Sequence, residues 1–460
     1  MAVSNLFVFP VVLLLTDLLW WLAVDRRLQI LRHARLWRVL LGAFMGTMTS
    51  YVLVILIGPR SFRGSQAPEP QIVHVIAYLW HFIGLPMGVL MMAGISFSKT
   101  VREIASWLRN SKPVTLTLAT KRFGNPDAGS EVLRRSGSSI EKSGSSEYLR
   151  TGVISEPTPC KTALQPPPSA RSRQIYAPSR RQMIAATALA LPPLATCAAA
   201  LGATRTLYGR RLRSFDLVIP QLPPELEGMS IAHISDTHIG RFLHPSRLPA
   251  IAEDINRLDA DFVVFTGDLI DFSLEDLPAG LSFLRSLKSR CGMAICEGNH
   301  DIMDDRGDFE NQLRAQDLPL IIGGQFTLPY VSRTGRSFPV QFLATPWNFT
   351  DEFMEDAVHV VEPLVRTDAF PILLAHHPHH FDAASLAGMP LILSGHTHGG
   401  QIMLTDHFGA GSLRFRYISG HYQRNGSNLI VNNGLGNWFP LRINAPAEIV
   451  HITLHGLGGR

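Results

Sequence analysis

The sequence predicts an α/β domain behind an α-helical membrane region, and three observations lead to this prediction. Apolar runs of membrane-spanning length lie near the start of the chain. From about Ser214 onward, short apolar runs alternate with stretches in which apolar residues recur at helical spacing. Polar residues that can bind metal ions follow several of these short runs. Such alternation is typical of one α/β domain, here of about 250 residues.

Residues 1–97 are predicted to form a membrane region with three helices, over Leu6–Val24, Leu40–Gly58 and Val73–Phe97. The loop between the first two runs contains five arginines, whereas the next loop contains two. The positive-inside rule therefore places the first loop in the cytoplasm and the amino terminus outside. Asp17 lies in mid-span, where a charge is costly in lipid, so we expect it to make polar contacts with other helices.

Residues 98–182 are predicted to be a disordered basic linker on the cytoplasmic side, because they are rich in Ser, Pro and Arg. This stretch contains 15 Lys or Arg and 6 Asp or Glu, a net charge of +9. From Thr206 to Arg460 the net charge is −9. The overall charge of +5 therefore comes from the front of the chain, and no nucleic-acid partner is expected for the α/β domain.

Residues 183–205 are predicted to be a fourth membrane helix or a signal-anchor. The preceding Arg180-Arg181 pair resembles a twin-arginine export signal, although such signals belong at an amino terminus. If this stretch spans the membrane, residues 206–460 lie outside the cytoplasm. The arginines on both sides of it do not settle the orientation.

The α/β pattern places buried strands at five short apolar runs, namely 229–234, 262–265, 293–296, 371–375 and 390–393. Each run leads into polar residues that can act as ligands: Asp236 and His238, Asp268, Asn299 with His300 and Asp301, His376, and finally His396 and His398. Ligands of open α/β sheets gather outside the carboxyl ends of the strands, so these side chains can converge on one site. The pattern therefore predicts a metal site made of carboxylate, amide and imidazole ligands, without a thiolate.

These motifs occur in the order Asp-x-His, Gly-Asp, Gly-Asn-His-Asp, His and Gly-His-x-His. In this order they resemble the calcineurin-like metallophosphoesterase family, over roughly Met229 to Leu454. The apolar front and the Arg-Arg pair look more like its membrane-associated branch, which includes bacterial phosphodiesterases with twin-arginine leaders and is related to UDP-diacylglucosamine pyrophosphatase. The resemblance implies a four-layer α/β/β/α sandwich.

The resemblance also implies seven ligands for two metal ions: Asp236, His238 and His398 for one, Asn299, His376 and His396 for the other, and Asp268 for both. Two cations about 3.5 to 4 Å apart, the usual separation in two-metal sites, need a shared anionic ligand to offset their repulsion. A hydroxide bridging the two metals would attack phosphorus in line with the leaving oxygen. Mixed nitrogen and oxygen ligands suit Mn, Fe or Zn, and the sequence does not choose between them.

Other polar residues near these motifs receive separate expectations. His300 is expected to stabilise transition-state charge or protonate the leaving group, with Asp301 orienting its ring. His379 and Arg442 are candidate substrate contacts, although a surface role for His379 and an ion pair of Arg442 with Glu448 are alternatives. Three further acids are expected to be solvated or helix-capping: Asp271, Asp304 and Asp305. His377 is expected to be structural.

The sequence as a whole predicts a multi-pass plasma-membrane or inner-membrane enzyme, a metal-dependent phosphoric ester hydrolase, with an extracytoplasmic catalytic domain. Its substrates are expected to be phosphodiesters or pyrophosphates of phosphorylated small molecules or of lipid and cell-envelope carriers. One alternative is a cytoplasmic-side pyrophosphatase of the UDP-diacylglucosamine type, which follows if residues 183–205 do not cross. Another is a non-catalytic membrane sensor or scaffold whose metal site is structural.

Overall fold

The structure is a computed structural model that describes residues 4–57 except 30 and 32, 71–110, 179–347 except 207 and 208, and 353–457. Its contacts divide the chain into two compact units, Met1–Ser96 with Pro178–Arg460, and Phe97–Ala177. Most of the predicted linker, residues 111–178, lies outside the described residues.

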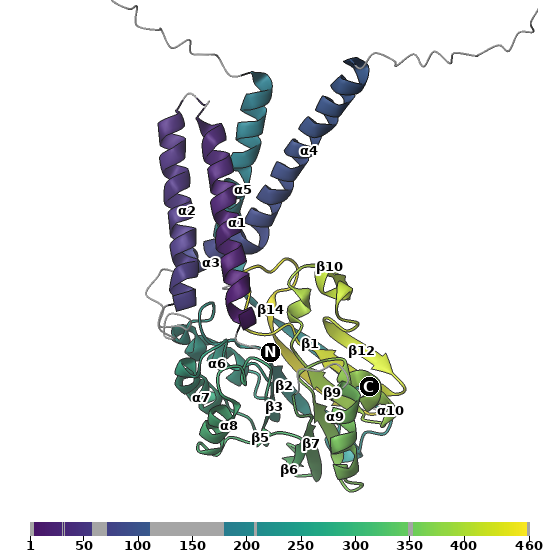
Figure 1. Ribbon diagram of the computed structural model, residues 1–460. Coiled ribbons are helices and arrows are strands. Elements are labelled where there is room, and N and C mark those ends of the chain that lie inside the picture. Colours follow the sequence, from purple (N-terminus) through teal and green to yellow (C-terminus); the bar gives the residue numbers. More distant parts are fainter. Residues whose placement is uncertain are drawn as a thin grey trace, which may run out of the picture. The chain divides into compact units, whose positions relative to one another are not determined.

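The front of the chain is helical (Figure 1), with the elements α1 (Ser4–Leu28), α2 (Ala34–Ile57), α3 (Gln71–Leu79), η2 (Trp80–Gly84), α4 (Leu85–Asn110) and α5 (Arg180–Thr206). Within the described residues, two stretches are long and apolar enough to cross a membrane, Ala34–Leu56 and Ile72–Trp107. The first and fourth predicted spans are helical as α1 and α5, but their crossing of a membrane stays a prediction. Asp17 contacts Trp80 and His81 of another helix, which confirms the expectation of an interhelical polar contact.

The third predicted span differs from a single helix in two ways. It contains a π-helical turn at η2, directly before Pro86. Proline has no amide hydrogen for the carbonyl four residues earlier, and its ring crowds that carbonyl, so the helix widens locally. The helix also continues to Asn110, so residues 98–110 of the predicted linker are helical, with Lys99 and Glu103 forming an i,i+4 ion pair.

The α/β domain contains two six-stranded sheets and a small two-stranded sheet. The first sheet has the order β1 (Arg210–Val218), β14 (Ala447–His455), β2 (Ser230–Ile234), β3 (Phe262–Thr266), β4 (Gly292–Cys296) and β5 (Leu320–Ile321). The second has the order β12 (Gly420–Arg424), β13 (Ser427–Val431), β9 (Leu391–Ser394), β8 (Phe370–Leu374), β7 (Ser337–Ala344) and β6 (Gly324–Val331). The small sheet pairs β10 (Met403–Thr405) with β11 (Phe408–Gly409).

Strands β2, β3 and β4 run parallel in the first sheet, and β7, β8, β9 and β13 run parallel in the second. The carboxyl ends of each parallel set therefore lie at one edge of its sheet. Strands β2, β3, β8 and β9 are almost completely buried, as expected for parallel strands covered on both faces.

The two sheets pack face to face around a core that includes Ile231, Phe262, Phe342 and Ile372. The outer face of the first sheet is covered by α6 (Leu248–Asn256), α7 (Leu277–Ser286) and α8 (Arg306–Arg314), and that of the second by α9 (Phe353–Val361) and α10 (His380–Leu386) (Figure 1). These are four layers in the order α/β/β/α, which confirms the predicted fold class.

The five strands predicted from the sequence are β2, β3, β4, β8 and β9, each within about one residue of its expected bounds. The remaining strands of the two sheets have no ligand motif at their ends. Strand β6 is mostly exposed or half-buried and contains Pro329, so it lacks the continuous apolar run that identifies the five predicted strands. The edge strands β1, β5, β6 and β12 and the inner strands β7, β13 and β14 are seen only in the structure.

Candidate metal centre

The seven predicted ligands come from five loops that each follow the carboxyl end of a parallel strand. Strands β2, β3 and β4 of the first sheet lead to Asp236, His238, Asp268 and Asn299; strands β8 and β9 of the second lead to His376, His396 and His398. Backbone hydrogen bonds tie these loops together, from Asp236 N to Gly267 O at 2.9 Å and from Gly395 N to His376 O at 3.0 Å. The two sheets thus bring their ligand-bearing edges to one place.

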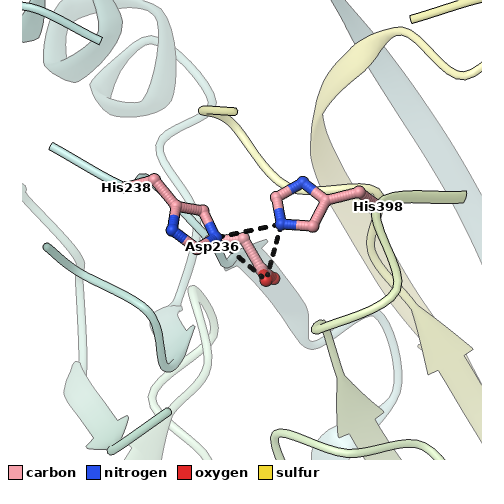
Figure 2. Close-up of side chains that lie close together, drawn as sticks. All are labelled: Asp236, His238 and His398. Carbon is pink, nitrogen blue, oxygen red and sulfur yellow. Dashed lines mark hydrogen bonds and ion pairs between the residues drawn. The ribbon is translucent and has the colours of Figure 1, made fainter. Parts of the chain in front are cut away.

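One group of ligand atoms is formed by Asp236, His238 and His398, all of them buried. Figure 2 shows the two imidazole rings converging on the aspartate, with the two Nε2 atoms 2.9 Å apart. The Asp236 carboxylate oxygen Oδ1 lies 3.3 Å from His398 Nε2 and 3.8 Å from His238 Nε2. The three side chains therefore direct one ligand atom each toward one point, which is the arrangement that a metal ion requires.

A second group contains Asp268, His376 and His396. The side-chain oxygen of Asn299 joins them, because it lies 2.9 Å from His396 Nδ1 and 3.3 Å from His376 Nε2. His376 donates from its other nitrogen, Nδ1, to the carbonyl of Thr266 at 2.6 Å. This hydrogen bond leaves the lone pair of His376 Nε2 directed toward the group.

Asp268 lies between the two groups. Its Oδ2 atom is 3.4 Å from His238 Nε2 in the first group and 3.3 Å from His376 Nε2 in the second. Its other oxygen, Oδ1, accepts a hydrogen bond from the backbone N–H of His300 at 2.8 Å. The carboxylate is therefore held by the loop after β4 and faces both groups, as a shared ligand must.

The backbone of this site is unusual, because five of its non-glycine residues have positive φ: Asp236 (49°), His238 (42°), Asp268 (58°), His396 (70°) and His398 (50°). Left-handed backbone is costly for residues with a Cβ atom and persists where the surrounding structure enforces it, often at functional sites. Two glycines make the close packing possible. A Cβ at Gly298 would collide with the Asp268 carboxylate, and one at Gly395 would collide with that of Asp236.

The four histidines of the two groups form two pairs, one with raised and one with lowered pKa. Burial alone lowers the pKa of a histidine, but the carboxylates of Asp236, Asp271 and Asp268 overcome it and raise the pKa of His238 to about 10. In the same way, Asp268 raises the pKa of His376 to about 9 against the effect of burial.

For His396 and His398 burial dominates, and it lowers the pKa to about 3 and about 4. Among the carboxylates, burial acts to raise the pKa of Asp268, but the charges of nearby histidines hold it below its usual value. The site therefore contains ionised carboxylates and, in His396 and His398, imidazoles that stay neutral.

These donors fit metal ions. The facing nitrogens of His238 and His398 are only 2.9 Å apart and both lie close to the Asp236 carboxylate, so one cation could take the place of the proton between them. Imidazole nitrogens with carboxylate and amide oxygens, and no sulfur, suit Mn, Fe and Zn. The described residues thus provide candidate ligands for two ions that share Asp268.

The structure corrects the expectation that Asp301 orients His300. The Asp301 carboxylate accepts four backbone hydrogen bonds, from the amides of Gly298, Asp268, Leu269 and Ile270. The ring of His300 is instead oriented by a hydrogen bond from its Nδ1 to the carbonyl of Asp271 at 2.6 Å. Asp301 therefore holds together the loops after β3 and β4, while His300 lies beside the shared ligand.

The expectation that Asp271 is a solvated or helix-capping acid is wrong. Its side chain is buried, with Oδ1 3.6 Å from His238 Nδ1 and 3.7 Å from His300 Nδ1. Neither carboxylate oxygen nor His238 Nδ1 has a hydrogen-bond partner in the part of the chain that the structure describes. The acid therefore lies behind two site histidines. The signal that could have found it is its place three residues after Asp268, in the same loop. Asp305 does cap a helix, since it accepts from Asp308 N at the start of α8.

Arg442 lies behind His398. Its guanidinium is buried and donates to the carbonyls of Asn433 and Ala445 at 2.9 Å, and it reaches His398 Nδ1 at 3.0 Å. Because a guanidinium can only donate, the Nδ1 atom is the acceptor in this contact. The alternative ion pair with Glu448 is not formed, since Glu448 pairs with Arg211 at 2.7 Å.

The other histidines of the fourth motif surround the second group. The ring of His377 is buried and lies 4.6 Å from the ring of His396, as a packing residue would. His379 is half-buried and accepts a hydrogen bond from Arg416 N at 3.2 Å through its Nε2 atom. His379 therefore stands at the margin of the site, next to the chain around Phe415.

Comparisons with known proteins agree with this site. Residues 229–400 match the calcineurin-like phosphoesterase family. Relatives include an uncharacterized metallophosphoesterase of Campylobacter jejuni (29% identical, covering 53% of this chain and 63% of the relative) and one of Bacillus subtilis (30% identical, 51% and 81%). A transmembrane protein with a metallophosphoesterase domain from Danio rerio is 29% identical over 52% of this chain and 56% of its own. The match thus spans less than two thirds of the Campylobacter relative.

Proposed function

The chain belongs to the calcineurin-like phosphoesterase family, and from this premise we propose that it is a membrane-anchored phosphoesterase with two metal ions. Members of this family generally use two divalent metal ions and act on phosphorylated substrates. The observation that carries the proposal is the position of Asp268, which faces His238 on one side and His376 on the other at 3.4 and 3.3 Å. A single structural metal would not need a carboxylate shared in this way.

When bound, the metal pair supplies Lewis-acid activation of water and of the phosphoryl group. The chain supplies the remaining functions. Asp268 keeps the two ligand groups at a constant separation, and Arg442 holds the ring of His398 from behind. His300 donates from Nδ1 to the Asp271 carbonyl, so its Nε2 would donate to a phosphoryl or leaving-group oxygen in the imidazolium form of the ring. The exclusion of thiolates keeps the site suited to hard oxygen-rich substrates.

We also propose that the catalytic domain lies outside the cytoplasm, because basic residues gather at the ends of the helices that are far from it. Near the start of α5, Leu189 packs in a cluster with Val24 and Leu28 of α1, next to Arg26 and Arg27. Near its end, α5 packs against the domain: Ala200 and Ala203 share a cluster with Phe242. The positive-inside rule then places the arginines in the cytoplasm and the domain on the opposite side.

Substrates attached to lipid or cell-envelope carriers follow from this placement, since an anchored site meets the phosphates of the adjacent bilayer first. Both phosphodiesters and pyrophosphates are compatible with the ligand set. The choice between them depends on the leaving group, which the metal ligands do not contact.

The central experiment uses the full chain, purified in detergent and loaded with Mn²⁺, with bis(p-nitrophenyl) phosphate as substrate. We expect hydrolysis that stops with a chelator and falls by about 10³-fold in Asp268→Asn, which removes the shared charge. Asp259→Asn is the matched control, because Asp259 is also an aspartate with positive φ but is exposed and pairs with Arg333. Failure of the loaded wild type to hydrolyse this ester or a panel of lipid phosphates would show that the metal site is not catalytic.

Sidedness is tested separately with reporters fused after Arg460, one active only in the cytoplasm and one only outside it. We expect activity from the external reporter alone. Activity of only the cytoplasmic reporter would overturn the external placement and favour a cytoplasmic-side pyrophosphatase.

A further inference from the structure

Five large apolar residues are exposed between residues 401 and 443, in the chain that follows the last ligand motif: Leu404, Phe408, Leu413, Trp438 and Ile443. We call this set the apolar rim. Leu413 is 94% exposed, Leu404 72% and Phe408 56%. Single exposed apolar residues are ordinary on protein surfaces, but several in one folded element mark an interaction surface.

The apolar rim is held by a defined structure. Strand β10 pairs with β11, and Met403 N donates to Ile443 O at 2.9 Å, which joins the small sheet to the segment 437–443. Beneath it, Met403, Ile418 and Ala445 form a buried cluster of their own. The rim side chains therefore project from a supported platform, and their exposure is built into the fold.

The apolar rim is continuous with the contact between the domain and the helical region. Phe439, which follows Trp438, has its ring 6.3 Å from that of Tyr78 and 5.8 Å from that of Phe82. Leu441 packs against the cluster that contains Val75 of α3. Both Tyr78 and Phe82 belong to the stretch Ile72–Trp107, which is apolar enough to cross a membrane.

From this continuity we propose that the apolar rim inserts into the lipid interface of the bilayer that holds the helices. The inference rests on the membrane anchoring in the proposed function. A tryptophan beside leucine and phenylalanine side chains is the composition that partitions into the headgroup region, where apolar groups leave water and the indole N–H still finds a partner. A surface that begins at a membrane helix has lipid as its nearest apolar neighbour.

Insertion would place the metal centre at the lipid surface. The rim platform starts directly after His398, since Gly400 packs against Gly411 and the chain from Gln401 leads into β10. A phosphate in the headgroup layer is then within the reach of the site while the acyl chains stay in the bilayer. The proposed insertion of the apolar rim therefore implies that the substrate comes from the membrane.

The test measures whether Leu413 is in lipid. The full chain, with Cys160, Cys197 and Cys291 replaced by serine, carries Leu413→Cys labelled with an environment-sensitive fluorophore and is placed in lipid nanodiscs, one copy per disc. The matched control is Leu386→Cys in α10, which is 76% exposed and lies outside the rim. We expect a blue-shifted emission at position 413 and quenching by spin-labelled lipid about threefold stronger than at position 386.

Equal quenching at the two positions would overturn the proposal. A blue shift at position 413 that appears only with two copies per disc would also overturn it, because the rim would then be an interface between copies of the chain. The same holds for a shift that requires an added protein.

Activity gives an independent measurement. The double variant Leu404→Asp/Leu413→Asp should lose at least about fivefold more activity on a phosphoester carried by a lipid than on bis(p-nitrophenyl) phosphate. An equal loss on both substrates overturns the inference. If the wild type hydrolyses neither substrate, the proposed function fails, whereas the quenching result still decides whether the rim lies in lipid.

Discussion

Two buried polar clusters of this protein differ in how completely their atoms are bonded. In the helical region, both carboxylate oxygens of Asp17 accept hydrogen bonds at 2.9 Å, one from Trp80 Nε1 and one from His81 Nε2. The other ring nitrogen of His81 bonds to the carbonyl of Ala77 at 2.8 Å. The carboxylate of Asp17 and the ring nitrogens of Trp80 and His81 are all hydrogen-bonded, and the three residues lie in helical segments, Asp17 in α1 and the other two in the π-helical turn η2.

The metal centre has the opposite character. Its rings present nitrogen to nitrogen at His238 and His398, and Asp271 lies buried with both oxygens unbonded among the described residues. Five of its residues also have left-handed backbone. A fully hydrogen-bonded polar cluster stabilises a fold, whereas buried polar atoms without hydrogen bonds and left-handed backbone cost free energy and are often retained for binding. The comparison therefore separates a structural polar core from a functional one.

The largest expected effect sharpens this comparison within the metal centre. His396→Ala and His398→Ala should each reduce bound metal from two ions to about one and lower activity by about 10³-fold, because each ring serves a different ligand group. Metal content by mass spectrometry and hydrolysis rates check this. His407→Ala is the control, since His407 lies outside both groups. Loss of both ions in either variant would contradict the division of ligands.

The next prediction concerns the hydrogen-bonded cluster of Asp17, Trp80 and His81 in the helical region. Asp17→Ala should lower the free energy of unfolding by about 2–4 kcal/mol, because it leaves Trp80 and His81 buried without partners. Asp17→Asn should cost less than about 1 kcal/mol, since an amide can accept from Trp80 and donate to a neutral His81. Unfolding of the full chain in mixed micelles measures both, with metal content unchanged. A larger loss in the asparagine variant would show that the charge of Asp17 is required.

A smaller effect tests Asp271 as a positioning residue for His238 and His300. Asp271→Asn should weaken metal binding by about 10- to 100-fold, the usual consequence of losing an acid behind a ligand histidine. Asp304→Asn is the control, since Asp304 is an exposed acid that accepts from Leu274 N. Titration with Mn²⁺ measures affinity independently of turnover. An unchanged affinity with reduced activity would instead place the effect on His300 alone.

The smallest effect is a pH dependence of metal binding. The pKa values of His238 and His376 are raised to about 10 and about 9. Without metal, both rings are therefore protonated on both nitrogens and positively charged at neutral pH. The resulting stabilisation of the metal-free chain is complete below the ordinary histidine pKa of about 6.5 and is lost as the pH rises through about 9 to 10.

Metal must displace these protons, so its affinity should rise by about tenfold per pH unit for each proton released, from neutral pH up to about pH 9. Calorimetric titrations in buffers of different ionisation enthalpy count the protons. Affinity that is flat between pH 7 and pH 9 would show that the two rings are already neutral.

The motifs and the apolar helices could be predicted from the sequence because their signals are local. An apolar run followed by Gly-Asn-His or Gly-His-x-His specifies a buried strand and the polar loop after it, and hydropathy alone found α2 and the start of α3. Pro86 is also a local signal, since a proline inside an apolar helix indicates an irregular turn just before it. The prediction of a single helix over Val73–Phe97 did not use this signal.

The supporting contacts were decided only by the tertiary structure. Asp301 accepts hydrogen bonds from the backbone of a loop about 30 residues earlier in the chain, and Arg442 contacts His398 from 44 residues later. Beneath the apolar rim, a backbone hydrogen bond joins Met403 to Ile443. Residue type and spacing determine what a strand and its loop can offer. Which loops become neighbours depends on strand order and on the packing of two sheets, and these follow from burying the whole core at once. The sequence by itself therefore predicted the candidate ligands, and the fold decided what holds them and which surface lies beside them.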